Sequence, residues 1–138
     1  MKSAKFQTRA FTVLEGLLVL FISSFILFLF TSNMKKTIQL VRGELFVLQF
    51  ERLYKDTQHR AGLKNQSETL ISQNGKISSK EEVIELPREA EINDFSITFD
   101  DKAGNSSLQK IIIYLPYQRK TISYQLEIGS GKYNKTIS

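Results

Sequence analysis

A long apolar segment near the amino terminus constrains this chain more than any other feature. The twenty residues from Phe11 to Phe30 are mostly Leu, Phe, Val and Ile. As a helix they would extend about 30 Å, enough to cross the hydrocarbon core of a bilayer. Glu15 is the exception, because a carboxylate costs about 2.5–3.5 kcal/mol at the centre of a membrane helix and somewhat less near its end. Such acids are rare and usually have a partner, so Glu15 is a candidate functional residue.

The residues before this segment argue against an ordinary secretory signal peptide. Met1 to Ala10 contain three basic residues and no acid, a charge pattern that keeps this end of the chain in the cytoplasm. A signal peptide would carry a small-residue cleavage site after its apolar run, whereas here Ala10 stands before the run and no such site follows Phe30. A plain signal anchor with an incidental Glu15 remains the alternative.

The basic leader, Ala10, and the residues Phe11-Thr12-Val13-Leu14-Glu15 that follow together resemble the class III signal of type IV prepilins. The resemblance implies a peptidase that cleaves between Ala10 and Phe11 and methylates the new amino terminus at Phe11. Glu15 would then be the fifth residue of the mature protein. The family usually has Gly before the cleaved bond, so Ala10 is a departure from its pattern.

Charge and composition narrow the remaining function classes. The net charge of +5 is reduced to +2 without the leader, so it is weak evidence for a nucleic-acid partner. The chain has no Cys and a single His, His59, which we expect to be an exposed helix residue. Disulfides, thiol chemistry and a metal site built from Cys or several His are therefore excluded.

Helix signals continue beyond the apolar segment to about Arg60. One stripe at helical spacing consists of Met34, Ile38, Val41, Leu45 and Leu48, and a second consists of Phe46, Phe50 and Leu53. Two stripes suggest that one face packs on the protein's own sheet and the other meets a different partner. We expect the aromatic stripe to face the sheet, because aromatic side chains fill a small core efficiently.

From residue 61 the pattern changes to short β-prone segments. Gly62 is expected to cap the helix, and Asn74-Gly75 indicates a two-residue hairpin. The apolar run Ile111–Leu115 predicts a strand buried on both faces, and the whole predicts one antiparallel meander. The expected fold is therefore α+β, with one long N-terminal helix packed on a small antiparallel sheet. Its expected parts are a leader at 1–10, a membrane-spanning half-helix at 11–31, an amphipathic half at 32–60, and a β domain at 61–138.

No catalytic constellation is apparent, so we predict that the chain is not an enzyme and needs no cofactor or metal. Asp100, Asp101 and Asn105 could hold Ca²⁺ through loop oxygens, but an ordinary Asx turn is the favoured interpretation. Basic residues outnumber acids after Asp101, and Arg119, Lys120 and Lys132 are candidate DNA contacts through phosphates. Ordinary surface lysines are the favoured alternative.

Further segments carry a narrower resemblance. Residues 50–58, 96–100, 104–108, 122–126 and 129–132 look like those of ComGD-type minor pilins of the competence pilus. The resemblance implies a type IV pilin-like fold and a role in pilus assembly or initiation and in DNA uptake during transformation. It also implies as partners the other competence pilins, the prepilin peptidase, an assembly ATPase with its membrane platform, and lipid before assembly. The implied location is the bacterial membrane and then the extracellular pilus.

Two other classes stay open at this stage. One is a single-pass membrane-anchored sensor or regulator with a small extracellular β domain. The other is an anchored enzyme, for which the sequence offers no active site.

Overall fold

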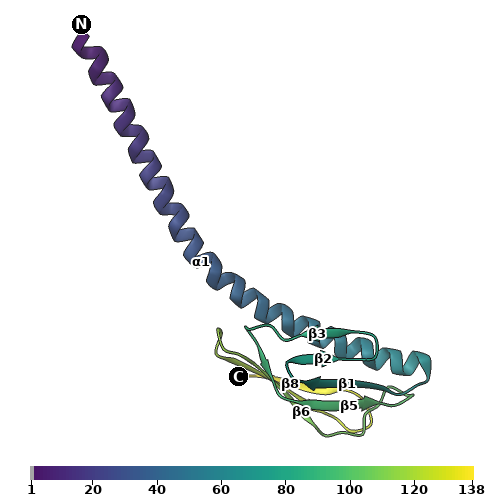
Figure 1. Cartoon of the computed structure of the whole chain (residues 1–138). Coiled ribbons are helices and arrows are strands. Elements are labelled where there is room, and N and C mark those ends of the chain that lie inside the picture. The colour runs from purple at the N-terminus through teal and green to yellow at the C-terminus, as the bar shows by residue number, and fades with distance from the viewer. Residues whose placement is uncertain (1) are drawn as a thin grey trace. The chain divides into compact units, whose positions relative to one another are not determined.

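The structure, a computed structural model, describes residues 2–138. One helix, α1 (Lys2–Lys64), is followed by eight strands in two antiparallel four-stranded sheets (Figure 1). The first sheet has the order β3 (Val83–Glu85), β2 (Lys76–Ser78), β1 (Glu68–Gln73) and β5 (Phe95–Phe99). The second has the order β4 (Glu91–Ile92), β6 (Lys110–Leu115), β7 (Lys120–Leu126) and β8 (Tyr133–Ile137). The chain divides into two compact units, Met1–Ile38 and Gln39–Ser138.

The helix ends later than the sequence predicts. Gly62 lies inside α1 and does not cap it, because α1 continues to Lys64. Asn65 instead takes the left-handed conformation that closes a helix, with φ of 49°, and the Gln66 amide donates to the Ala61 carbonyl at 3.3 Å. Asn is the usual alternative to Gly at this position, because its short polar side chain tolerates positive φ.

The expected α+β architecture is confirmed, but the expected single meander is divided into two sheets. The Asn74-Gly75 hairpin is confirmed, with both residues at positive φ between Gln73 and its partner Lys76. The prediction that β6 is buried on both faces is wrong. Its residues alternate, so that Ile112 is 38% exposed although Ile111 and Ile113 are fully buried. An antiparallel sheet covered by a helix on one face requires only that face to be apolar.

The core forms where both sheets meet one face of α1. Phe46, Phe50, Leu53 and Tyr54 are each 1% exposed. The Phe50 ring lies 6.1 Å from that of Phe95 in the first sheet, and 5.3 Å from a ring in the second sheet, that of Tyr124. The prediction that the aromatic stripe faces the sheet is therefore confirmed. The other apolar stripe, which consists of Met34, Ile38, Val41, Leu45 and Leu48, is exposed, as expected for a helix with two separate apolar faces.

Truncation of the Phe50 side chain should destabilise the β domain. We expect Phe50→Ala to lower the free energy of unfolding of a fragment beginning at Gln39 by about 3–5 kcal/mol, because it removes a buried ring that contacts both sheets. Leu45→Ala, on the exposed face, is the matched control and should change it by less than about 0.5 kcal/mol. Urea denaturation measures both values, and equal losses would show that the two faces do not differ as described.

Candidate functional site

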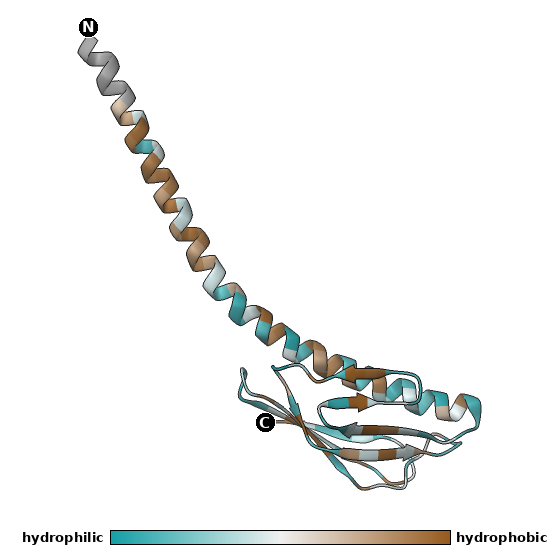
Figure 2. Ribbon diagram, viewed as in Figure 1, coloured by the Kyte–Doolittle hydropathy of each residue, from teal (hydrophilic) through white to brown (hydrophobic). Residues whose placement is uncertain are grey.

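The apolar segment that opens α1 is a large exposed surface. Its hydrophobic side chains from Phe11 to Phe30 are between 46% and 71% exposed. Figure 2 colours most of this part of the helix as hydrophobic. By length and composition α1 contains one candidate membrane span, within Ala10–Lys64. A soluble monomer rarely exposes so much contiguous apolar surface, so this surface requires lipid or other helices around it.

The residues expected to be processed lie at the start of this segment. Ala10, Phe11 and Glu15 all lie on α1 with exposed side chains. Glu15 is one turn beyond Phe11, and the ion pairs of the described residues do not include it. The geometry thus places a carboxylate close to the amino group that cleavage before Phe11 would create.

A second exposed apolar surface lies further along α1, in the unit that carries the sheets. Val41, Leu45 and Leu48 are 49%, 50% and 60% exposed and form one side of a shallow groove of about 510 Å³. Gln118, from the turn between β6 and β7, lines the groove, and its amide donates to the Leu40 carbonyl at 3.1 Å. We call Val41, Leu45 and Leu48 the outer stripe.

The inner side of the same helix segment approaches the second sheet closely because of a glycine. A Cβ on Gly43 would lie 3.3 Å from Leu115 Cδ2 and 3.5 Å from the Glu89 carbonyl oxygen. Arg42, next to it, forms an ion pair at 3.5 Å with the nearly buried Glu89 carboxylate. The helix is therefore held against the sheet at the level of the outer stripe, which stays exposed on the far side.

Two further ion pairs fasten α1 to the second sheet. Lys120 contacts Glu44 at 2.9 Å, and Lys135 contacts Glu51 at 2.5 Å. The Tyr124 hydroxyl also donates to Glu51, at 2.7 Å. Partial burial acts to raise the pKa of Glu51, but the Lys135 ammonium and the Tyr124 hydroxyl outweigh it, so the pKa lies below its ordinary value. Burial, together with the Glu51 carboxylate, raises the pKa of Tyr124.

The last turns of α1 hold two loops of the β domain. The Tyr54 hydroxyl donates to the Gly131 carbonyl at 2.8 Å, and the Gln58 amide donates to the Ala103 carbonyl at 3.1 Å. Gly131 is needed here, because its φ is positive and a Cβ would lie 2.4 Å from the backbone carbonyl oxygen of Ala103. Burial raises the pKa of Tyr54 above its ordinary value.

The loop that offered a calcium site is an Asx turn. Asp100 Oδ1 accepts hydrogen bonds from the amides of Lys102 and Gly104, at 3.0 and 2.8 Å. Its side chain therefore closes its own loop. Within residues 10–138, no group of three His, Asp or Glu side chains is placed to hold a metal ion.

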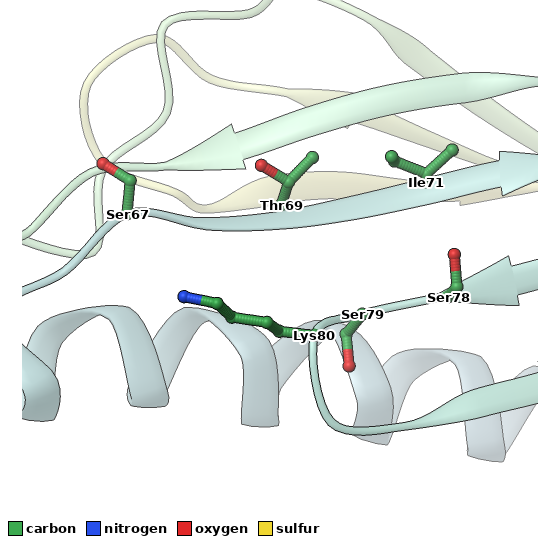
Figure 3. A pocket seen from close by; sticks show the side chains of 6 residues that line it. All are labelled: Ser67, Thr69, Ile71, Ser78, Ser79 and Lys80. Atoms are coloured by element: carbon green, nitrogen blue, oxygen red, sulfur yellow. The ribbon is translucent and has the colours of Figure 1, made fainter.

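A hydroxyl-lined cleft of about 290 Å³ lies between β1 and the β2–β3 connection (Figure 3). Two of its hydroxyls are hydrogen-bonded within the fold, since Thr69 pairs with Thr98 and Ser79 accepts from Arg60 at 3.0 Å. Lys80 is the only titratable residue among those lining it. His59, elsewhere on α1, is exposed as expected. The cleft thus offers no acid–base pair for catalysis.

The candidate DNA contacts are not brought together. Arg119 ends the turn before β7, whereas Lys132 lies in the turn that follows β7, at the opposite end of that seven-residue strand. Lys120 is already paired with Glu44. The local excess of basic residues therefore does not form one cationic patch from these three residues.

Sequence reasoning missed the residues that fasten the helix to the sheets. Tyr54 and Thr57 continue the aromatic stripe one and two turns beyond Phe50, and both are buried. Extending the stripe at helical spacing would have found them. Glu51 and Gln58 carried no such signal, because their partners lie 73 and 45 residues away in the sequence.

Comparison with known proteins gives one clear relative. The chain is 33% identical over 132 residues to the competence protein ComGD of Streptococcus pneumoniae strain R6, covering 95% of this chain and 81% of that protein. No family model matches the chain. No solved structure is significantly similar to it.

The contacts of Glu51 should make the free energy of unfolding of the β domain depend on pH. Because folding lowers the pKa of Glu51, its contribution is present above the ordinary value of 4.5 and is lost as the pH falls through the folded-state pKa. Glu51→Gln should therefore cost about 1–2 kcal/mol of unfolding free energy near pH 7 and much less near pH 3. Urea denaturation at both pH values checks this.

Lys135→Met is the matched control for that experiment. In this background the cost of Glu51→Gln at neutral pH should shrink, because the charged partner is gone. A cost that is the same at both pH values would contradict the assignment of the interaction to the ionised carboxylate.

Proposed function

Because this chain belongs to the ComGD family of competence proteins, we propose that it is a minor pilin of a competence type IV pilus. In this role it helps to initiate or assemble the filament through which DNA is taken up during transformation. The observation that carries the proposal is a single helix with two exposed apolar surfaces, the segment Phe11–Phe30 and the outer stripe, beside a face already buried by the protein's own sheets. Its partners in this proposal are the other competence pilins.

The protein first resides in the cell membrane through residues 11–31, with its β domain outside. A prepilin peptidase removes residues 1–10 and methylates Phe11. An assembly ATPase and its membrane platform then transfer the subunit from lipid into the filament on the cell surface. The exposed apolar side chains of α1 support this transfer, because they can exchange contacts with lipid for contacts with neighbouring helices at little cost.

Glu15 favours the transfer of the subunit from lipid into the filament. A carboxylate among acyl chains is costly, whereas the amino terminus of a neighbouring pilin offers it a charged partner. Leaving the lipid therefore favours the pairing of Glu15 with the newly exposed terminal amine of that neighbouring pilin. The outer stripe then packs between helices of adjacent subunits, side chains of one filling the grooves of the next.

Processing can be tested at the cleaved bond. Ala10→Arg should block removal of residues 1–10, because the peptidase needs a small side chain before the bond it cleaves. Mass spectrometry of the amino terminus should find Phe11, methylated, in the wild type and Met1 in the variant. Ser3→Arg adds the same charge away from the bond and should be processed normally. Wild-type protein that retains Met1 in peptidase-competent cells would favour the membrane-anchored sensor instead.

Glu15 should be needed for assembly and not for folding. Glu15→Ala and Glu15→Gln should leave a processed, membrane-inserted protein but lower filament number and transformation by about tenfold or more, equivalent to about 1.4 kcal/mol of lost pairing. Val19→Ala, one turn along the same segment, should have little effect. Unchanged filament number in both Glu15 variants would contradict the proposed pairing.

A further inference from the structure

The C-terminal strand β8 leaves one edge of the second sheet open. The sheet order places β8 next to β7 alone, and Figure 1 marks it beside the C-terminus. The amide of Thr121 donates to the carbonyl of Ser138 and the amide of Ser138 donates to the carbonyl of Thr121, each at 2.9 Å. Because hydrogen-bonded and non-hydrogen-bonded residue pairs alternate between antiparallel strands, this pair shows which residues of β8 are not bonded to β7. The N–H and C=O groups of Tyr133, Lys135 and Ile137 consequently point away from β7.

The other sheet edges among the described residues are short or already occupied. β3 has three residues and is followed by Pro87, and β4 has two residues. On the outer side of β5, Phe99 forms a bridge with Asn105, and the Ser96 amide donates to Gln109 Oε1 at 3.2 Å. Proteins usually blunt their edge strands in such ways, whereas β8 has five residues and contains no Pro.

The charged side chain in β8 does not protect this edge. Lys135 turns toward α1, where it contacts Glu51 at 2.5 Å, and its ammonium lies 5.8 Å from the centre of the Tyr124 ring. A lysine blunts an edge strand only when its charge would have to be buried by an incoming strand. Here the charge is already paired on the inner face, so a new strand could approach without isolating it.

The exposed apolar side chain of Ile137 lies at the open edge. Ile137 pairs with the buried Ile122, one pleat along from the Lys135–Tyr124 pair, so its side chain is on the face of the sheet that carries α1. It remains 56% exposed, because no strand among the described residues pairs with the outer edge of β8. On α1, Leu48 lies between Glu44 and Glu51, the two residues that pair with the second sheet, and is 60% exposed.

We propose that β8 is a docking edge that takes up an extended strand from a different pilin subunit of the same filament. The main chain of that strand pairs with Tyr133, Lys135 and Ile137, and one of its apolar side chains covers Ile137. This inference rests on the proposed function. A second copy of this chain fits less well, because a two-fold β8–β8 pair closes as a dimer, whereas a filament needs heterologous contacts.

The test uses a proline at an outward-facing position. Ile137→Pro removes an N–H that points away from β7, so the ladder within the protein stays intact while the docking edge loses a donor. Val83→Pro is the matched control. The Ser79–Glu82 and Gly75–Leu86 pairs are hydrogen-bonded, so by alternation the Ser78–Val83 pair between them is not, and the Val83 N–H points away from β2. Like Ile137, Val83 is an exposed β-branched residue.

Both full-length variants are produced in cells that contain the other competence pilins. We expect Ile137→Pro to lower the recovery of a partner pilin from detergent-solubilised membranes by about tenfold or more, and Val83→Pro to leave it at the wild-type level. Melting temperatures of both purified variants should stay near that of the wild type. Equal recovery for all three proteins, equal loss for both variants, or recovery of this chain alone would overturn the proposal.

Hydrogen exchange provides a second measurement that does not depend on a substitution. In filaments or in the purified complex, amides of residues 133–138 should exchange at least about tenfold more slowly than in the isolated subunit, whereas those of residues 83–86 should not change. Unchanged exchange at residues 133–138 would overturn the proposal. Cleavage before Phe11 and filament number are scored in the same strains, so failure of strand pairing is distinguishable from failure of the pilin role.

Discussion

The structure depends on the burial of one face of α1 between two sheets. Phe50 contacts rings of both sheets, and Tyr54 packs at 5.1 Å against Phe99 of the first sheet and Tyr133 of the second. Because the chain has no Cys, no disulfide supports this core, and the domain is held by the core together with hydrogen bonds and ion pairs. A helix has limited surface, so burying this face decides which residues are left outside, and the outer stripe is among them.

Polar contacts then set the register of the helix on the sheets. Arg42, Glu44 and Glu51 form ion pairs with residues of the β domain, and Gln58 donates a hydrogen bond to one of its loops near the end of α1. Hydrophobic packing alone would permit small shifts along the helix, whereas charged and hydrogen-bonded partners require one alignment. The same alignment presents Val41, Leu45 and Leu48 together on the exposed side.

Features that depend on local sequence were predictable, and features that depend on distant partners were not. The assignment of Phe46, Phe50 and Leu53 to the core follows from helical spacing and aromatic content. The division into two sheets was not predictable, because short strands carry no mark of which partner they pair with. The contacts of Glu51 with Lys135 and Tyr124 could not be predicted from the sequence for the same reason. The expectations for Ala10, Phe11 and Glu15 are of another kind, because they follow from the resemblance of the local sequence to a prepilin signal and do not depend on the fold.

The outer stripe is exposed in the single subunit, and in the proposed filament it is buried between helices. The chain contains no cysteine, so Leu45→Cys provides one unique thiol on that stripe, and His59→Cys provides one on an exposed part of α1 as a control. Labelling with a water-soluble maleimide should modify both thiols in the detergent-solubilised subunit, but only the thiol at position 59 in sheared filaments. Equal labelling of position 45 in subunits and filaments would contradict the account.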